Sequence, residues 1–260
     1  MRNGQNLLTD LARWGISPTL RGTGRVEQTA DRICLRVGPQ QEDGYSNAQL
    51  DDYHHDGYFR RRAPVTLHIR ARFTVPFDAF AGTAGFGFWN DPVGMTGRPR
   101  LAPPRALWFF LASPHSRMPL VLDRPGWGWT AASLGVSWPT ALGLAPIAPV
   151  LAILQRVPAL NQRLWPWLRS RLCLAGTALD PAGLTEWHDY TLIWHPSGAH
   201  FRVDGVEVAY HAVAPRGTLG LVVWIDNQYL VARETGALRG GTVTCGAQGL
   251  ELAGLQIIAG

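Results

Sequence analysis

Residues 187–208 read WHDYTLIWHPSGAHFRVDGVEV and carry the clearest secondary-structure pattern in the chain. Tyr190, Leu192 and Trp194 occupy alternate positions, which is the period of a strand with one face in a core. The turn residues HPSG at 195–198 end this strand, and a second alternating stretch follows them. Asp204-Gly205 then provides the two positions of positive φ that a type I′ hairpin turn requires. We therefore expect three consecutive antiparallel strands joined by short turns.

Other segments show the same kind of pattern. Residues 65–73 place Val, Leu, Ile, Ala and Phe on one face and polar side chains on the other. Residues 85–89, 219–229 and 250–258 also favour strands. Residues 105–112, RALWFFLA, lack polar alternation, so a strand there must be buried on both faces or covered.

The order of these motifs resembles the concanavalin A-like lectin/glucanase superfamily, and glycoside hydrolase family 16 in particular. The resemblance is carried by the Trp187-His-x-Tyr-x-x-x-Trp strand, by Val203-Asp204-Gly205, and by Arg70-Ala71-Arg72 ahead of GFGFW at 85–89. Residues 219–229 and 250–258 are similar to the later strands of that family. The resemblance covers most of the chain outside residues 113–180 and implies an all-β jelly-roll sandwich, a single domain over residues 1–260.

The composition fits such a domain. Apolar residues make up 46% of the chain and charged residues 17%, while 29 Gly and 19 Pro indicate many turns. The net charge is +5, but the arginines are scattered and no nucleic-acid motif accompanies them, so no nucleic-acid partner is expected. Cys34, Cys173 and Cys245 form no Cys-x-x-Cys pattern. We expect no metal site, disulfide framework or cofactor.

Residues 113–180 depart from the strand pattern and are expected to form an insertion. Residues 134–154 contain no charge, but Pro139, Pro146 and Pro149 argue against a continuous membrane-spanning helix. Helical pieces are expected at about 149–172, where the insertion would form a lid. An alternative is contact with a membrane surface, because the amphipathic stretch is rich in Arg and Trp. Its contact residues would be Arg163, Trp165, Trp167, Arg169 and Arg171.

Met1 to Asp10 lacks the apolar segment of a secretory signal. We therefore expect a cytoplasmic protein, with peripheral membrane attachment as the alternative. The sequence leaves the oligomeric state open.

The resemblance also implies a place for the chemistry. In family 16 the catalytic strand carries Glu-x-Asp-x-Glu, whose alternate carboxylates line one cleft. By order along the chain that strand corresponds to residues 105–112, which hold no carboxylate. The family's acid/base pair cannot be carried over to this chain. Ordinary family 16 hydrolysis is therefore not expected, and whether the protein is an enzyme stays open.

Our first hypothesis is a non-catalytic binding protein with an apolar, Trp-lined cleft beneath the lid. Its ligand would be lipid-like or a saccharide. The aromatic walls would be formed by Trp89, Trp108, Phe110, Trp127, Trp129 and Trp224. Polar contacts at the rim would come from Asn90, Asp91, Asp226 and Asn227. Any one of these Trp residues is more often a core residue than a ligand contact.

The second hypothesis is an enzyme with relocated acidic residues, either glycoside hydrolase-like or an isomerase or cyclase of an apolar substrate. Asp226 and Asp91 are the catalytic candidates. Asp226 shares a strand face with Trp224, and an aromatic neighbourhood raises the pKa of a carboxyl group. The cluster Asp51-Asp52-Tyr53-His54-His55-Asp56 could hold acid/base groups, but a solvated loop is the favoured interpretation.

Overall fold

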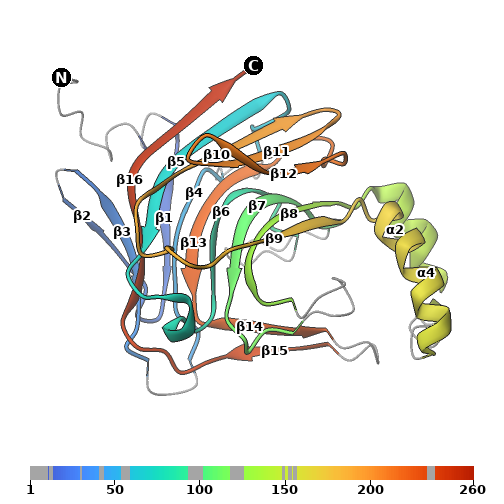
Figure 1. The fold of residues 1–260 in the computed structure, drawn as a ribbon, viewed down its shortest axis with the longest axis horizontal. Coiled ribbons are helices and arrows are strands. Elements are labelled where there is room, and N and C mark those ends of the chain that lie inside the picture. The colour runs from blue at the N-terminus through green and yellow to red at the C-terminus, as the bar shows by residue number, and fades with distance from the viewer. Residues whose placement is uncertain are drawn as a thin grey trace.

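Two seven-stranded antiparallel sheets face each other in the computed structural model (Figure 1). The structure describes residues 11, 14–29, 31–40, 44–53, 59–92, 102–117, 126–147, 150–151, 154, 157–232 and 238–260. Sheet A has the order β1 (Ser17–Arg21), β4 (Asn47–Asp51), β13 (Gly220–Asp226), β6 (Thr83–Trp89), β7 (Arg105–Ala112), β8 (Gly128–Gly135) and β9 (Ala175–Leu179). Sheet B has the order β12 (Val206–His211), β11 (Gly198–Val203), β10 (His188–His195), β5 (Val65–Phe73), β16 (Gln248–Ala259), β3 (Ile33–Val37) and β2 (Arg25–Gln28).

The stretch at residues 187–208 forms the expected strands β10, β11 and β12. Tyr190, Leu192 and Trp194 are all buried, so the alternating face of β10 does point into the core. The turn between β11 and β12 has φ of 51° at Asp204 and 80° at Gly205, as a type I′ turn requires. The carboxylate of Asp204 also accepts a hydrogen bond from the backbone N–H of Asp189 at 2.9 Å, which ties the turn to β10.

The two sheets share one hydrophobic core. From sheet A, β7 contributes Leu107, Phe109 and Leu111, which are buried against the facing strands of sheet B. Phe109 contacts Tyr190 of β10 and Phe201 of β11, with ring centroids 5.2 Å apart in both cases. The all-β sandwich predicted from the sequence is thereby confirmed, and the opposite face of β7 must point away from sheet B.

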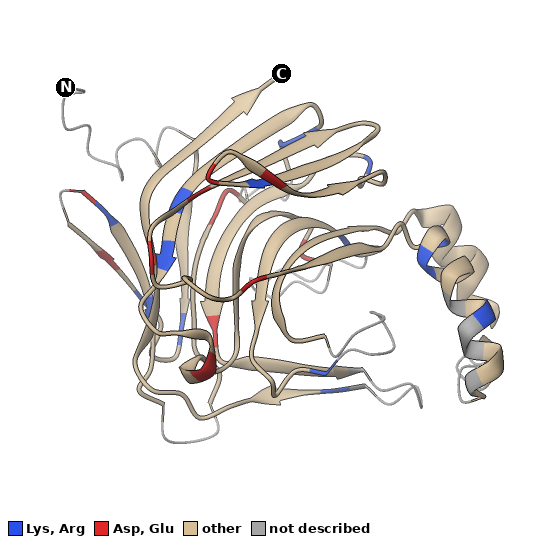
Figure 2. Cartoon of the chain, viewed as in Figure 1, with Lys and Arg blue, Asp and Glu red and all other residues tan. Residues whose placement is uncertain are grey.

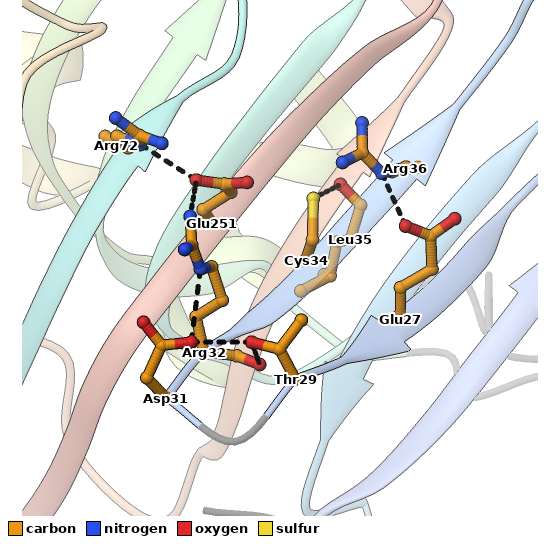
Figure 3. A network of polar contacts seen from close by, with 9 residues as sticks. All are labelled: Glu27, Thr29, Asp31, Arg32, Cys34, Leu35, Arg36, Arg72 and Glu251. Atoms are coloured by element: carbon orange, nitrogen blue, oxygen red, sulfur yellow. Dashed lines mark hydrogen bonds and ion pairs between the residues drawn. The ribbon is translucent and has the colours of Figure 1, made fainter.

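The outer face of sheet B carries a network of ion pairs (Figure 3). Glu251 of β16 is buried and its Oε2 accepts from Nε of Arg72, on β5, at 2.8 Å. Arg32, just before β3, approaches the same oxygen at 3.6 Å. At the sheet edge Arg36 pairs with Glu27 at 2.8 Å. These contacts join β5, β16, β3 and β2 across the sheet.

The structure narrows the insertion expected at residues 113–180. Within that range β8 and β9 are strands of sheet A, so the inserted segment lies between them, at 136–174. It contains α2 (Trp138–Leu144), η2 (Ala145–Ile147) and α4 (Pro158–Arg171), whereas the sequence predicted helical pieces at about 149–172. In Figure 1 the two helices project from the sandwich beside the junction with β8 and β9.

Some residues of this segment, including 148–149, lie outside the described residues. Among the helices that the structure describes, none has both the length and the apolar character to cross a bilayer. A short hairpin, β14 (Gln228–Ala232) and β15 (Leu238–Thr242), follows β13 at the other end of sheet A (Figure 1). A single 3₁₀ turn, η1 (Phe77–Ala79), joins β5 to β6.

Candidate functional site

The face of sheet A that points away from sheet B carries a cluster of aromatic side chains. Because Leu107, Phe109 and Leu111 face the core, strand alternation places Trp108 and Phe110 on the outer face. The strand register sets their neighbours: Trp108 lies opposite Gly87, and Phe110 lies opposite Gly85. On the far side of β6, Gly85 also pairs with Trp224 of β13. Three adjacent strands therefore contribute to one surface.

We call Trp89, Trp108, Phe110 and Trp224 the aromatic face. Trp108 is its centre, with ring centroids 5.7 Å from Trp89, 5.6 Å from Phe110 and 5.3 Å from Trp224. Trp89, Trp108 and Phe110 are partly exposed, and Trp224 is 8% exposed. A partly exposed group of stacked and tilted rings offers an apolar surface to a ligand.

Glycines in β6 leave the room that these rings occupy. A Cβ atom at Gly85 would lie 2.8 Å from Cη2 of Trp224, and one at Gly87 would lie 2.8 Å from Cβ of Trp108. Both separations are closer than side chains tolerate. The backbone oxygens of Phe109 and Leu107 would be nearer still to these two Cβ atoms, so the Gly-x-Gly pattern in GFGFW lets β7 and the side chain of Trp224 approach β6 closely.

Asp226 lies on the same face, next to Trp224. Its Oδ1 accepts three hydrogen bonds: from N of Thr83 at 3.2 Å, from Oγ1 of Thr83 at 2.8 Å and from N of Gln228 at 3.0 Å. Oγ1 of Thr83 in turn accepts from Nε1 of Trp224 at 3.1 Å. Burial raises the pKa of Asp226 to about 7, although the three donors act in the opposite direction. The expected raised pKa beside an aromatic wall is therefore present.

A polar group lies on the other side of the aromatic face, and it includes Asp51 of the cluster for which the sequence favoured a solvated loop; that interpretation is wrong for Asp51 and Asp52, which are both buried. Asp51 of β4 is buried, and its Oδ2 accepts from Oγ1 of Thr19 at 2.8 Å and from Nε2 of Gln49 at 2.9 Å. Burial raises the pKa of Asp51. The alternation of Asn47, Gln49 and Asp51 along one strand was the available signal, but pairing with β13 was needed to place it.

Tyr53 lies at the end of this polar group. Its ring contacts Phe59 at 5.1 Å, and its hydroxyl is buried without a hydrogen-bond partner among the residues that the structure describes. Burial raises the pKa of Tyr53 well above its usual range, with the charges of Asp51 and Asp91 adding to the effect. An unpaired buried hydroxyl is costly and suits a site that accepts a further hydrogen-bonding group. Residues 54–58, with the rest of the acidic and histidine cluster, lie outside the described residues.

Two of the expected wall residues do not lie on this face. Trp129 is 3% exposed in the core, where it contacts Phe73, Phe86 and Phe109. Trp127 is 40% exposed and stacks on Phe77, with centroids 6.1 Å apart. The strand begins only at Gly128, and Gly126 and Gly128 have positive φ values of 85° and 106°, so simple alternation does not extend back to Trp127.

The expected rim amides are occupied by backbone contacts. Nδ2 of Asn90 donates to O of Pro103 at 2.9 Å, and its Oδ1 accepts from N of Arg105 at 2.9 Å. The side chain of Asn227 bonds Ser46, Gly44 and Val243. Asp91 is buried and has φ of 40°, an uncommon conformation for a residue with a side chain. The side-chain amides of Asn90 and Asn227 therefore hold loops in place at the ends of β6 and β13.

The carboxylates on this face are far apart. Among the described strands of sheet A, the outer face holds Asp51 and Asp226, one on each of two paired strands. Asp226 pairs with Asn47, which is four residues from Asp51, so the two Cα atoms are separated by about 13 Å along the strands. Trp224 and its partner Gln49 lie between them on this face. The described residues also contain no group of three metal-ligating side chains that could hold an ion.

No protein-family model matches the sequence, and no curated protein shows significant similarity to it. Among solved structures, a glycoside hydrolase family protein from Mycobacterium thermorestibile has a TM-score of 0.50 at 12% identity, over 94% of this chain and 93% of that protein. The fold is a concanavalin A-like jelly roll. A GlcNAcα1-4Gal-releasing endo-β-galactosidase from Clostridium perfringens also has a TM-score of 0.50, at 10% identity, over 94% of this chain and 58% of that protein.

At these identities the likeness concerns the fold alone. It agrees with the resemblance drawn from the sequence motifs. The jelly roll places β7 inside sheet A, flanked by β6 and β8, with its outer face composed of Ala106, Trp108, Phe110 and Ala112. The position at which the family resemblance implies acidic side chains is thus filled by aromatic and small ones.

Proposed function

We propose that the protein binds a saccharide on the aromatic face without hydrolysing it. The observation that carries the proposal is the partly exposed cluster of Trp89, Trp108 and Phe110 on a jelly-roll sheet. Sugar rings present C–H groups on their faces and hydroxyls at their edges. Flat aromatic rings match the first, and hydrogen-bonding side chains match the second.

The polar group beside the rings supports a saccharide over a purely apolar ligand. Thr19, Gln49 and Asp51 form one hydrogen-bonded set on the neighbouring strands of the same face. The Tyr53 hydroxyl, two residues after Asp51, is buried and has no hydrogen-bond partner among the described residues. A saccharide hydroxyl would satisfy it, whereas a lipid-like ligand would not.

The test is binding to a panel of soluble β-glucans and galactans, measured by affinity electrophoresis or calorimetry. We expect Trp108→Ala to lower the affinity at least about fivefold, because stacking on one ring is worth on the order of 1 kcal/mol or more. Trp127→Ala is the matched control: it removes an equally large, more exposed ring that lies off the aromatic face. Equal affinities for Trp108→Ala and the wild type would refute the proposal.

A second candidate function is acid catalysis by Asp226, which its raised pKa favours. The same panel tests it by the release of reducing ends. Hydrolysis by the wild type that is lost in Asp226→Asn would support catalysis and contradict the non-hydrolytic proposal. Binding without release of reducing ends would support the proposal.

A further inference from the structure

A cavity of about 460 Å³ lies where the helical segment joins sheet A. Its walls come from the start of β7, the end of β8, the beginning of α2, the end of α4 and the loop before β13. No residue of the aromatic face lines it. Arg105 shares its strand face with Leu107 and Phe109, which point to the core, whereas Trp108 and Phe110 lie on the outer face. The cavity is therefore a separate feature from the proposed saccharide site.

The cavity is lined by positive charge. Arg105, Arg171 and Arg216 contribute to its walls, and no acidic residue is among the described residues that line it. None of the three makes an ion pair with another described residue. Arginines that converge without a carboxylate create a local potential that attracts an anion.

Arg105 is held in place rather than free in solvent. It is partly buried at the start of β7, and its Nη1 donates to the backbone O of Arg216 at 2.6 Å. The loop can pass this close because residue 217 is glycine: a Cβ there would lie 2.6 Å from the same Nη1, and its φ is 87°. One guanidinium donor is thus used, and the remaining donors stay available to a ligand. Burial also lowers the pKa of Arg105, the expected effect of partial desolvation without an anionic partner.

The helices next to the cavity expose large apolar side chains. Trp138, which lines the cavity, is 52% exposed, Leu142 in the same helix is 65% exposed, and Trp167 of α4 is 43% exposed. Neither helix contains an acidic residue, and Arg171 lies 5.6 Å over the ring of Trp167. In Figure 2 the helices α2 and α4, which project from the sandwich, carry arginine positions and no acidic position. Exposed Trp and Leu interleaved with arginine is the composition of a segment that lies in a lipid interface.

We propose that the cavity and the two helices dock the protein on an anionic phospholipid surface. A lipid phosphate enters the cavity and accepts hydrogen bonds from Arg105, Arg171 and Arg216. Trp138 and Leu142 lie at the level of the headgroups and the first acyl carbons. Of the contact residues predicted from the sequence, Arg163, Trp167, Arg169 and Arg171 belong to α4, as does Trp165, whose side chain is outside the described part.

The experiment is flotation of the full chain with phosphatidylcholine vesicles that contain or lack phosphatidylglycerol, at low and high salt. We expect wild type to float with the anionic vesicles at low salt. The double variant Arg171→Gln, Arg216→Gln should lose about thirtyfold in partition coefficient. Leu142→Ser should also weaken flotation without a change in charge, because it removes an exposed apolar side chain from the interface.

The charge-matched control is Arg25→Gln, Arg239→Gln, which removes two exposed arginines on β2 and β15. If the two double variants lose flotation equally, the loss reflects net charge alone, and this would overturn the docking site. Absence of wild-type flotation would overturn it too, as would binding of inorganic phosphate or glycerol phosphate without binding of vesicles. Saccharide affinity should be the same in all these variants, which separates this proposal from the function proposed above.

Discussion

Asp226→Asn should abolish a large part of the pH dependence of stability. The folded-state pKa of Asp226 is about 7, against 3.8 for an ordinary aspartate, because the carboxyl group is buried beside Trp224. The three hydrogen bonds to this side chain all end on Oδ1. An asparagine amide oxygen can accept the same three bonds, so the variant changes the charge and keeps the geometry.

The sign follows from the raised pKa. Below about pH 4 the group is protonated in both the folded and unfolded chain and costs nothing. As the pH rises, the unfolded chain releases the proton first, so the free energy of unfolding falls until the folded carboxyl also ionises near pH 7. A shift of about three pKa units corresponds to a loss of at most about 4 kcal/mol above pH 7. The asparagine variant does not suffer this loss.

The assay is guanidinium unfolding of wild type and variant from about pH 4 to about pH 8. We expect the variant to gain on the wild type by up to about 1.4 kcal/mol per pH unit between these limits. Asp204→Asn is a control of opposite sign: hydrogen bonds from Asp189 and His188 lower the pKa of Asp204, so its loss should destabilise the protein above pH 4. If the free energy of unfolding varies with pH in the same way in wild type and in Asp226→Asn, Asp226 is ionised in the folded protein. That result would also remove Asp226 as a catalytic acid.

Three further substitutions test the packing that positions the site. Glu251→Gln should lower the free energy of unfolding by about 1–2 kcal/mol, because Arg72 and Arg32 lose a buried anion. The control is Glu27→Gln, in an exposed pair, which should change the free energy of unfolding by less than about 0.5 kcal/mol. Equal effects of the two substitutions would contradict this account. Gly85→Ala should cost about 1–3 kcal/mol in urea denaturation, since its methyl group meets the backbone O of Phe109 and the ring of Trp224, and an unchanged midpoint would show that β6 can shift. Trp194→Phe removes a bond to O of Pro215 of 3.2 Å and should lower the melting temperature by a few degrees, corresponding to about 1–2 kcal/mol; a melting curve identical to wild type would count against that bond.

The sequence predicted the strands whose two faces differ. β5 has the expected bounds and β10 buries the expected side chains, because alternation there reports directly on one buried face. β7 also has the expected bounds, although its sequence lacks polar alternation. Trp89, Trp108, Phe110 and Trp224 were expected together and lie together, since the order of the motifs fixes the order of neighbouring strands.

The strands β8 and β9 were not predicted, for a physical reason. β8 reads GWTAASLG and β9 reads AGTAL, so small side chains fill both faces and leave no alternation in hydrophobicity. Their low content of β-branched residues gives little propensity to compensate. The uncharged run that continues from β8 into α2 concealed the end of the strand. Asp51 was considered from the sequence, but its partners Thr19 and Gln49 were not, because their grouping depends on the pairing of β1, β4 and β13, which are distant in sequence.

The glycines of β6 also bear on how such a surface could change over evolutionary time. A Cβ atom at Gly85 would lie 2.8 Å from the ring of Trp224, and one at Gly87 would lie 2.6 Å from Cα of Trp108. A substitution at either glycine therefore forces the neighbouring strand or ring to shift. Changes on β6, β7 and β13 are coupled in consequence, so combined replacements would alter this surface more easily than single ones.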